Sequence, residues 1–416
     1  NDNVVDAASA IAVGETNVAT AATVVGDANS GVAASADGRI NVATAATVVG
    51  DNNSGVTADA DGSVNVVTAA TAVFDGNQAI SASATGDTNV ATAATVVGNA
   101  NSGITAASEG ATNVATAATV VGDNNTGAIL AKATGDTNVA TAATVVGDGN
   151  AGVLASAQGV RNIATAATVV GNDNVVDAAS AIAVGETNVA TAATVVGDAN
   201  SGITAASDGA TNVATAATVV GDNNTGAILA KVTGDTNIAT AATVVGDGNA
   251  GVLASAQGVR NIATAATVVG NDNVVDAASA IAVGETNVAT AATVVGDANS
   301  GVAASADGRI NVATAATVVG DNNSGVTADA DGSVNVVTAA TAVFDGNQAI
   351  SASADGDTNV ATAATVVGNA NSGVVAGSVG DTNIATAATV VGDGNAGVLA
   401  SAQGVRNIAT AATVVG

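Results

Sequence analysis

The residues that could do chemistry in this chain are carboxylates, because it contains no His and no Cys. Asp follows Gly at a fixed point of a repeated segment, as at Asp27, Asp51, Asp123 and Asp148. Carboxylates at turns are ligands that Ca²⁺ prefers, so one interpretation is a line of calcium sites. The other is an exposed, salt-screened row that keeps the protein soluble. The spacing favours the second, because calcium-binding nonapeptide repeats need their Gly-Asp motif far more often than once in 24 residues.

Catalysis has no candidate centre in this sequence. General acid–base chemistry would fall to the carboxylates, yet every acidic position is one of many near-copies. Lys132 and Lys231 are also copies of each other in the same sequence context. We therefore expect no enzyme activity and no cofactor, with Ca²⁺ as the one alternative.

Asn recurs in two series whose amides could bond to one another. If copies of the repeat stack, the NH₂ of one Asn can donate to the C=O of the next, and the pattern continues along the stack. Asn that only satisfies a local turn is the alternative, and invariance within the array favours ladders. The predicted ladder residues are Asn17, Asn41 and Asn65 in the first series and Asn29, Asn53 and Asn77 in the second.

These positions belong to an internal repeat. The segment N-[VI]-[AV]-T-A-A-T begins 17 times, spaced by 24 residues and occasionally by 25 or 26. A longer pattern divides residues 1–416, a single repeat array, into modules 1–171, 172–270 and 271–416. Each unit splits into halves of the form N-x8-G-x2, which predicts a strand and a tight corner in each half.

Strands fit these halves better than helices do. Val and Thr are abundant, and Gly or Asn breaks the runs about every ten residues, too soon for stable helices. The second half alternates in steps of two, from Val56 to Asp61. Short helix pairs are the alternative. The sequence thus predicts an all-β fold, a β-solenoid of 17 coils with a 24-residue repeat and two strands per coil, stacked as in cross-β structure.

Composition limits the partners and the core. The chain has 7 basic and 35 acidic residues, a net charge of −28, which argues against nucleic acid as a partner. No apolar run reaches the length of a membrane helix, so we expect no membrane span. With two Phe and no Trp, Tyr or Met, Ala and Val must fill a thin core.

The faces of the solenoid indicate a lateral partner. In the second half, Val56, Ala58 and Ala60 are predicted to point inward. In the first half, the same parity places Ala43, Ala45, Thr47 and Val49 outward. That series is largely apolar and recurs in every unit, so we expect rods to bundle through it.

An ice-binding solenoid is an alternative, because such proteins present outward rows of Thr. Thr44 and Thr47 are three residues apart, which places them on opposite faces of a regular strand. One Thr row among Ala and Val is a poor match to such a surface.

The repeat is interrupted by the ends of the chain. Residues 407–416 followed by residues 1–16 reproduce a segment that occurs intact at 162–187 and 261–286. The first coil is then split between the two termini. We expect head-to-tail polymerisation at this joint, which involves Asn1, Asn3, Asn407 and Gly416, because unpaired strand edges and ladders would meet there.

The strand–GxGN–strand arrangement resembles the repeats of curlin-type bacterial functional amyloids. It occurs at residues 147–150, 246–249 and 392–395. The resemblance implies a β-solenoid fibre at the cell surface, in an extracellular matrix such as a biofilm. The interrupted repeat and the apolar outward series separately predict that the protein itself is the partner, axially and laterally. A passive repeat spacer in a large surface adhesin is the alternative.

Overall fold

The computed structural model describes most of the chain. The described ranges are 8–27, 31–51, 55–73, 75, 80–100, 103–125, 129–225, 228–299, 301–322, 325–343, 345–346, 350–370, 373–394 and 397–415, without the side chains of 175–178 and 274–277. Two compact units make up the chain, unit 1 from Asn1 to Gly209 and unit 2 from Ala210 to Gly416. The boundary lies inside the 172–270 module, and the three modules stay a prediction.

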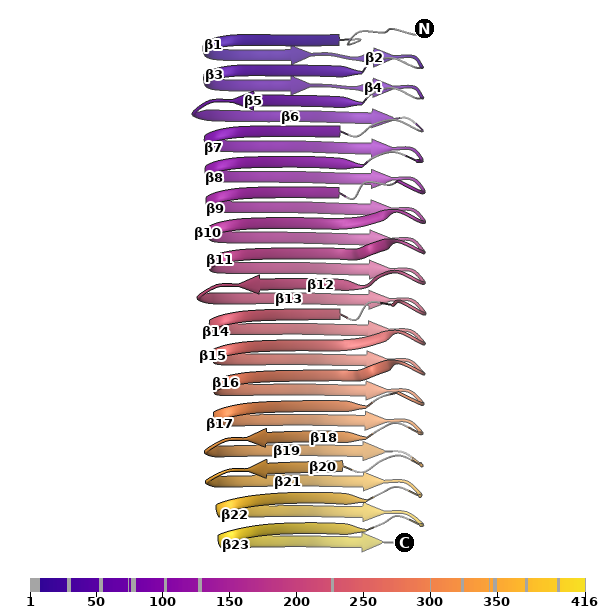
Figure 1. The fold of residues 1–416 in the computed structure, drawn as a ribbon. Coiled ribbons are helices and arrows are strands. Elements are labelled where there is room, and N and C mark those ends of the chain that lie inside the picture. The colour runs from indigo at the N-terminus through magenta and orange to yellow at the C-terminus, as the bar shows by residue number, and fades with distance from the viewer. Residues whose placement is uncertain are drawn as a thin grey trace. The chain divides into compact units, whose positions relative to one another are not determined.

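Every element in the described ranges is a strand, so the predicted all-β class is confirmed and short helix pairs are not found there (Figure 1). Unit 1 contains β1 Ala8–Ala21, β2 Val24–Val25, β3 Val32–Ala45, β4 Val48–Val49, β5 Val56–Asp61, β6 Val64–Val73, β7 Ile80–Val97, β8 Ile104–Val121, β9 Ile129–Val146, β10 Ala151–Val170, β11 Val175–Val196 and β12 Ile203–Asp208. Unit 2 contains β13 Thr211–Val220, β14 Ile228–Val245, β15 Ala250–Val269, β16 Val274–Val295, β17 Val302–Val319, β18 Val326–Asp331, β19 Val334–Val343, β20 Ile350–Asp355, β21 Thr358–Val367, β22 Val374–Val391 and β23 Val398–Val415.

The strands pair in parallel with the equivalent strands of the next turn, and the chain makes about 15 solenoid turns. Paired residues are 24 positions apart in most turns, as in Asn41↔Asn65. They are 25 apart in Asn113↔Asn138 and 26 apart in Asn162↔Asn188. The repeat length read from the sequence is therefore roughly the length of a coil in the described strands.

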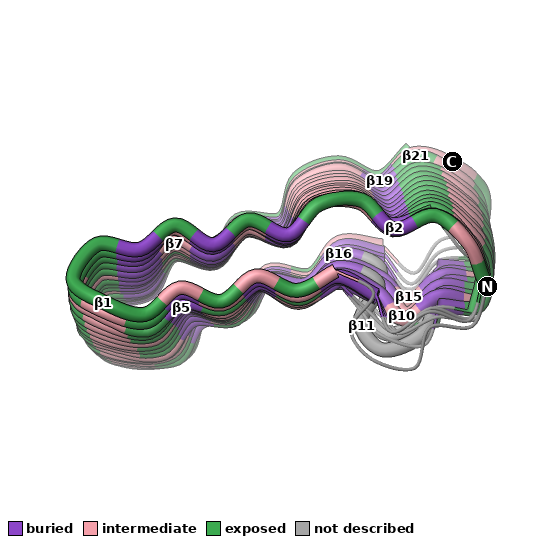
Figure 2. Tube along the Cα trace, turned by 90° about the horizontal axis from the view of Figure 1, so that it is seen from above, coloured by how far each residue is buried: buried purple, intermediate pink, exposed green. Residues whose placement is uncertain are grey.

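Each coil has two extended arms, seen end-on in Figure 2. We call the segment that starts at the opening Asn the first arm and the segment that returns from the opposite corner the second arm. In the coil that starts at Asn41, the first arm is residues 41–49 and the second arm is residues 56–61. The two arms face each other across the core.

One corner is tight enough to require Gly. At Gly86, an added Cβ would lie 1.4 Å from the carbonyl oxygen of Gly62 in the preceding coil. No side chain fits such an approach, so the stacking of coils and not the turn alone selects Gly here. The long strands, β7 for example, run through this corner and keep pairing with their neighbours on both sides.

The other corner carries a residue in the left-handed region. Gly149 has φ +64° there, while Ala199 and Asn124 adopt φ +56° and +55° at the equivalent position. Gly takes this conformation freely, whereas a residue with a Cβ does so at some cost. The corner fixes the direction in which the second arm starts.

The core between the arms is filled by Ala, Val and Ile, as the composition predicts. Ala58 and Ala60 of the second arm and Val48 of the first arm are at most 1% exposed. The largest fully buried side chains are Ile and Val, such as Ile80 at the start of a second arm. The small side chains let the two arms pack closely. No helix in the described part of the chain is long and apolar enough to cross a membrane.

Candidate functional site

The first Asn series forms the predicted ladder in both units. Asn41 Nδ2 donates to Asn65 Oδ1 at 2.8 Å, and Asn17 Nδ2 donates to Asn41 Oδ1 at 2.9 Å. The same amide nitrogen of Asn41 also lies 2.8 Å from Gly38 O and 2.7 Å from Asp61 O. Asn41 and Asn65 are only 1% exposed. Each amide thus ties the corner of its own coil to the neighbouring coil, which a purely local turn would not do.

The second Asn series forms a ladder of a different kind. Asn29, Asn53 and Asn77 lie outside the described residues, but their equivalents are visible. The backbone N–H of Asn125 donates to Asn150 Oδ1 at 2.8 Å, and that of Asn150 donates to Asn174 Oδ1 at 2.9 Å. Asn125 Nδ2 also donates to Asn150 Oδ1, whereas Asn150 Nδ2 donates to Gly122 O. Backbone amides therefore carry this ladder from coil to coil.

The Asp row proves to be a third ladder. The backbone N–H of Asp51 donates to Asp27 Oδ1 at 3.0 Å, and that of Asp148 donates to Asp123 Oδ1 at 2.9 Å. Asn takes the same role where it replaces Asp, since Asp123 N–H donates to Asn99 Oδ1 at 2.7 Å. Asp and Asn share an acceptor at Oδ1, which explains why the array uses these two residues at this corner.

This row is exposed, and its carboxylates accept bonds from the stack. The described residues contain no group of three or more His, Cys, Asp or Glu side chains arranged to hold a metal ion. Calcium binding at Asp27, Asp51, Asp123 and Asp148 remains a proposal, and it is not supported by any metal-binding arrangement among the described residues. The hydrogen-bonded row needs no cation to account for its residues.

The residues predicted at the polymer joint are mostly outside the described ranges. Asn1, Asn3 and Gly416 are not described. Asn407 lies in β23, where its Nδ2 donates to Gly404 O at 2.8 Å and its Oδ1 accepts from Asn383 Nδ2 at 2.9 Å. The first Asn ladder therefore extends to Asn407, and the joint itself stays a prediction.

The predicted lateral face is partly wrong. Ala43 and Ala45, expected to point outward, are fully buried, whereas Thr47 and Val49 are partly exposed as expected. The inward residues of this arm are Ala43, Ala45 and Val48, which are separated by steps of two and then three. The two adjacent residues between Ala45 and Val48 both lie on the outer side. This irregularity reverses the predicted parity for Ala43 and Ala45, because the prediction assumed strict alternation along the strand.

The irregularity is visible in the backbone. The first arm bows outward before β2 in Figure 2, and strand pairing is interrupted between β1 and β2 and between β3 and β4. As a result, Thr44 and Thr47 are both on the outer side, and the expectation that they face opposite ways is wrong. Each coil therefore presents two outward Thr residues, and these stack into two rows along the solenoid.

The sequence did contain a signal for this parity. In the coil that starts at Asn65, Val67 replaces the usual Ala and Ala72 replaces the usual Val, and both are 0% exposed. The same exchange occurs at Val337 and Ala342, also 0% exposed. A compensating change of volume at two positions five residues apart indicates that both fill the same core.

We call the outward residues of the first arm the first-arm face. In the coil that starts at Asn41 they are Val42, Thr44, Ala46, Thr47 and Val49. Across all 17 units the first of these positions is Val or Ile, and the other four never change. The face is uncharged, and its Val and Ile rows remain accessible, with Val66 41% and Ile163 46% exposed.

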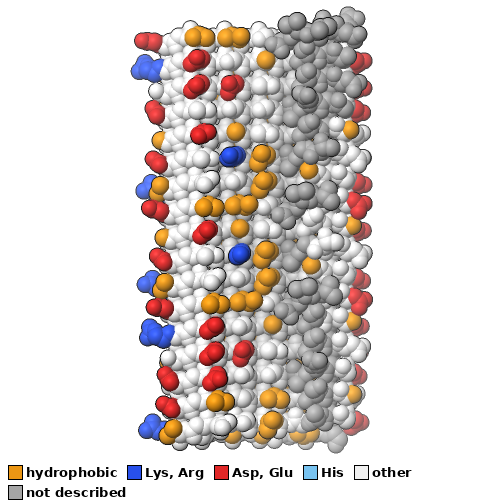
Figure 3. Space-filling model, viewed as in Figure 1, with side chains coloured by type: hydrophobic (Ala, Val, Ile, Leu, Met, Phe, Trp, Pro, Cys, Tyr) orange, Lys and Arg blue, Asp and Glu red, His pale blue; other side chains and the backbone are white. Residues whose placement is uncertain are grey.

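The outward residues of the second arm, the second-arm face, behave differently. One row reads Asp59, Ser83, Ala107 and Lys132 in four successive coils. Figure 3 views this face and shows acidic, basic and hydrophobic side chains scattered over it. The two faces belong to the same coils, so the second-arm face is an internal control for how freely an outward residue can vary.

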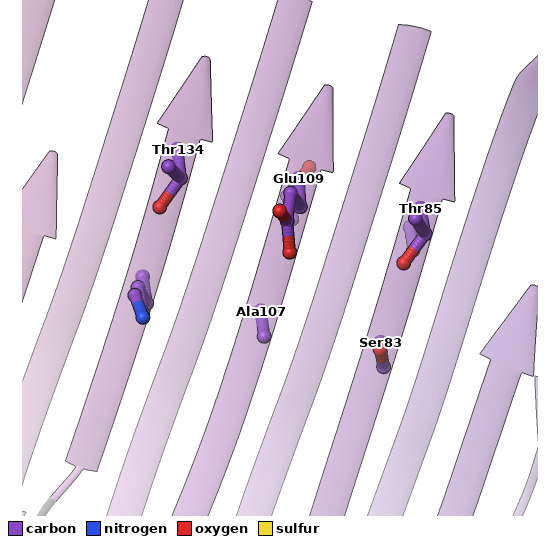
Figure 4. Close-up of a pocket in the computed structure, with 8 residues that line it drawn as sticks. Ser83, Thr85, Ala107, Glu109 and Thr134 are labelled. Carbon is purple, nitrogen blue, oxygen red and sulfur yellow. The ribbon is translucent and has the colours of Figure 1, made fainter. Parts of the chain in front are cut away.

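The second-arm face contains a shallow depression of about 100 Å³ across β7, β8 and β9. Figure 4 shows Ala107 beside Ser83, and Glu109 between Thr85 and Thr134. The depression lies where the small side chains of Ser83 and Ala107 adjoin the long side chain of Lys132 in the next coil. Its lining differs in the other coils, so it is a local gap in a varied surface.

Comparison with known proteins gives no family. No family model matches the chain, and no curated protein or solved structure is significantly similar to it. The first-arm face and the hydrogen-bonded ladders at the corners are the features that recur from coil to coil in the described residues.

Proposed function

We propose that this protein is a structural subunit of an extracellular fibre, a 17-coil solenoid with a 24-residue repeat whose copies associate laterally through the first-arm face. The observation that carries the proposal is the invariance of that face. Its side chains point away from the core, so folding alone does not fix them. The outward residues of the second arm vary within the same coils, from Asp59 to Lys132. A partner that contacts every coil in the same way would explain why the first-arm face is invariant while the second-arm face varies.

The size and chemistry of the face suit a protein partner. An arm of about eight residues is about 26 Å wide, and eight strands spaced by about 4.8 Å give roughly 1,000 Å² in unit 1 alone. A standard interface buries about 800 Å² on each partner. Val, Ile, Ala and the methyl groups of Thr make most of this surface apolar, which exceeds what a soluble monomer ordinarily exposes. The same face of a second copy is the simplest partner to cover it.

The ladders support a structural role. Three hydrogen-bonded rows, at Asn41, at Asn125 and at Asp51 for example, join each coil to the next in the described residues. Such rows resist unwinding of individual coils and keep the outward rows in register. Axial growth, with one copy stacked on the end of another, remains part of the proposal. So does a cell-surface location, which rests on the curlin-like repeat plan.

Charge placed on the first-arm face tests the proposal. One variant carries Thr116→Lys, Thr141→Lys and Thr165→Lys. The control carries three substitutions on the second-arm face, Ser81→Lys, Thr105→Lys and Ser156→Lys. Both variants lower the net negative charge equally, so a difference between them reports which face is in contact. We expect light scattering and electron microscopy to show bundles for the control and single rods for the first-arm variant. Bundles of unchanged spacing in both would overturn the proposal.

Ice binding is a second candidate, because the structure places Thr44 and Thr47 on the same side. Regular rows of hydroxyl and methyl groups on a rigid surface can match ordered water. The outward bow between β1 and β2 makes this face uneven, which is why we place self-association first. Two results together would favour this candidate. The wild-type protein would show thermal hysteresis that is lost in the variant with Thr116→Lys, Thr141→Lys and Thr165→Lys, and neither protein would form bundles.

A further inference from the structure

We infer that copies of this chain associate through the first-arm face at any stagger of a whole number of coils, so that overlapping neighbours by themselves build a fibre longer than one molecule. The inference rests on the proposed function and adds the axial offset that is allowed between neighbouring copies. The partner is a second copy of this chain.

The first argument is the translational symmetry of the face. Moving along a unit by one coil replaces Val42, Thr44, Ala46 and Thr47 by chemically identical residues. A copy shifted by one coil therefore makes the same contacts, less the strip lost at the end. Nothing on this face distinguishes one coil from the next, apart from the exchange of Val for Ile in its first row.

The second argument is where the array absorbs its irregularities. Coils of 25 or 26 residues carry their extra residues between the second Asn and the start of the second arm, between Asn125 and Ile129 for example. The register shift in the pairing of β10 with β11 also falls there, between Ala151 and Val153. First arms pair residue for residue from Asn162↔Asn188 to Val170↔Val196. The spacing of the outward rows is thus preserved in the longer coils.

The third argument is the contrast with the second-arm face. Its charges change from coil to coil, with Asp59 and Lys132 in one row of unit 1. A contact through that face would favour one register, in which opposite charges meet, and oppose the others. Sliding in whole coils is a property of the first-arm face alone.

Cross-linking tests the inference directly, because the chain has no native Cys. One protein carries Thr141→Cys. It is mixed in turn with proteins that carry Thr92→Cys, Thr116→Cys, Thr165→Cys or Thr191→Cys, all in the same outward row of unit 1. A short thiol-specific cross-linker then joins neighbouring rods, and the yield of each mixed dimer is measured by mass spectrometry.

We expect all four mixtures to cross-link with yields within about twofold of each other, because a shift of one or two coils among eight removes only about an eighth to a quarter of the contact area. A yield about tenfold higher for one position would overturn the free stagger and leave lateral association intact. Absence of cross-links in every mixture, while the rods still bundle, would overturn the first-arm face as the contact and with it the proposed function. A control with Ser83→Cys on the second-arm face should give little product.

Discussion

Replacing one buried ladder residue should open the solenoid locally, and Asn138 is a suitable position. Asn138 is 1% exposed. Its Nδ2 lies 2.6 Å from Gly135 O, 2.8 Å from Gln158 O and 2.9 Å from Asn162 Oδ1. Its Oδ1 accepts from Asn113 Nδ2 at 2.9 Å. Asn138→Ala removes all four interactions and leaves three acceptors without this donor.

The magnitude follows from these partners. A buried polar group left without a hydrogen bond costs about 1–3 kcal/mol. Asn113 Nδ2 keeps Gly110 O and Thr134 O as acceptors, so its share is small. We expect a local destabilisation of about 3–5 kcal/mol for Asn138→Ala, which raises the opening equilibrium of the neighbouring coils roughly 10²- to 4 × 10³-fold. Asn138→Asp should be at least as harmful, because it places a carboxylate oxygen against the same acceptors.

Hydrogen exchange measured by mass spectrometry is the suitable assay, because a repeat array opens by parts rather than all at once. Amides of β8, β9 and β10 should exchange faster in Asn138→Ala, while those of distant coils should change little. The matched control is Thr141→Val, an outward change in the same coil, with an expected effect within about 0.5 kcal/mol. Equal exchange in Asn138→Ala and in the wild type would refute the view that the Asn ladder holds adjacent coils together.

Four further predictions concern the corners. Gly86→Ala should destabilise the fold by about 3 kcal/mol or more, because its Cβ would meet Gly62 O at 1.4 Å. The control Gly377→Ala should be harmless, because nothing lies within 4 Å of its Cβ. Urea denaturation compares the two, and similar midpoints would contradict the close-approach argument. Ala199→Gly should stabilise by up to about 1 kcal/mol, because Ala199 has φ +56°, while Ala206→Gly in a strand should destabilise by a similar amount. A lower Tm for Ala199→Gly would count against strain at this corner. Asp148→Ala should cost about 1 kcal/mol because Asn172 N–H loses its acceptor at 2.7 Å, whereas Asp148→Asn should be nearly neutral. Adding Ca²⁺ or a chelator should leave the Tm of the wild type unchanged, and a clear rise with Ca²⁺ would support the cation alternative instead.

The repeat, the strand content and the first Asn ladder could all be predicted from the residues alone. These properties depend on periodicity, and the stacking of identical units follows once the period is known. The parity of the second arm was also determined, because Val56, Ala58 and Ala60 alternate with polar residues. Asn41 could be assigned to a ladder because an amide is both donor and acceptor, so identical residues can bond to one another.

The parity of the first arm and the role of the Asp row became clear from the stacked coils. Both alternating series of the first arm are largely apolar, so alternation alone does not distinguish inward from outward residues there, and only the paired exchange at Val67 and Ala72 indicates which positions share the core. The outward pair Ala46 and Thr47 shifts the alternation, and the physical reason is that Val48 completes the core beside Ala45. The hydrogen bond from Asp51 N–H to Asp27 Oδ1 joins residues 24 positions apart. It exists only because the coils are stacked, and no local pattern of residues could specify it.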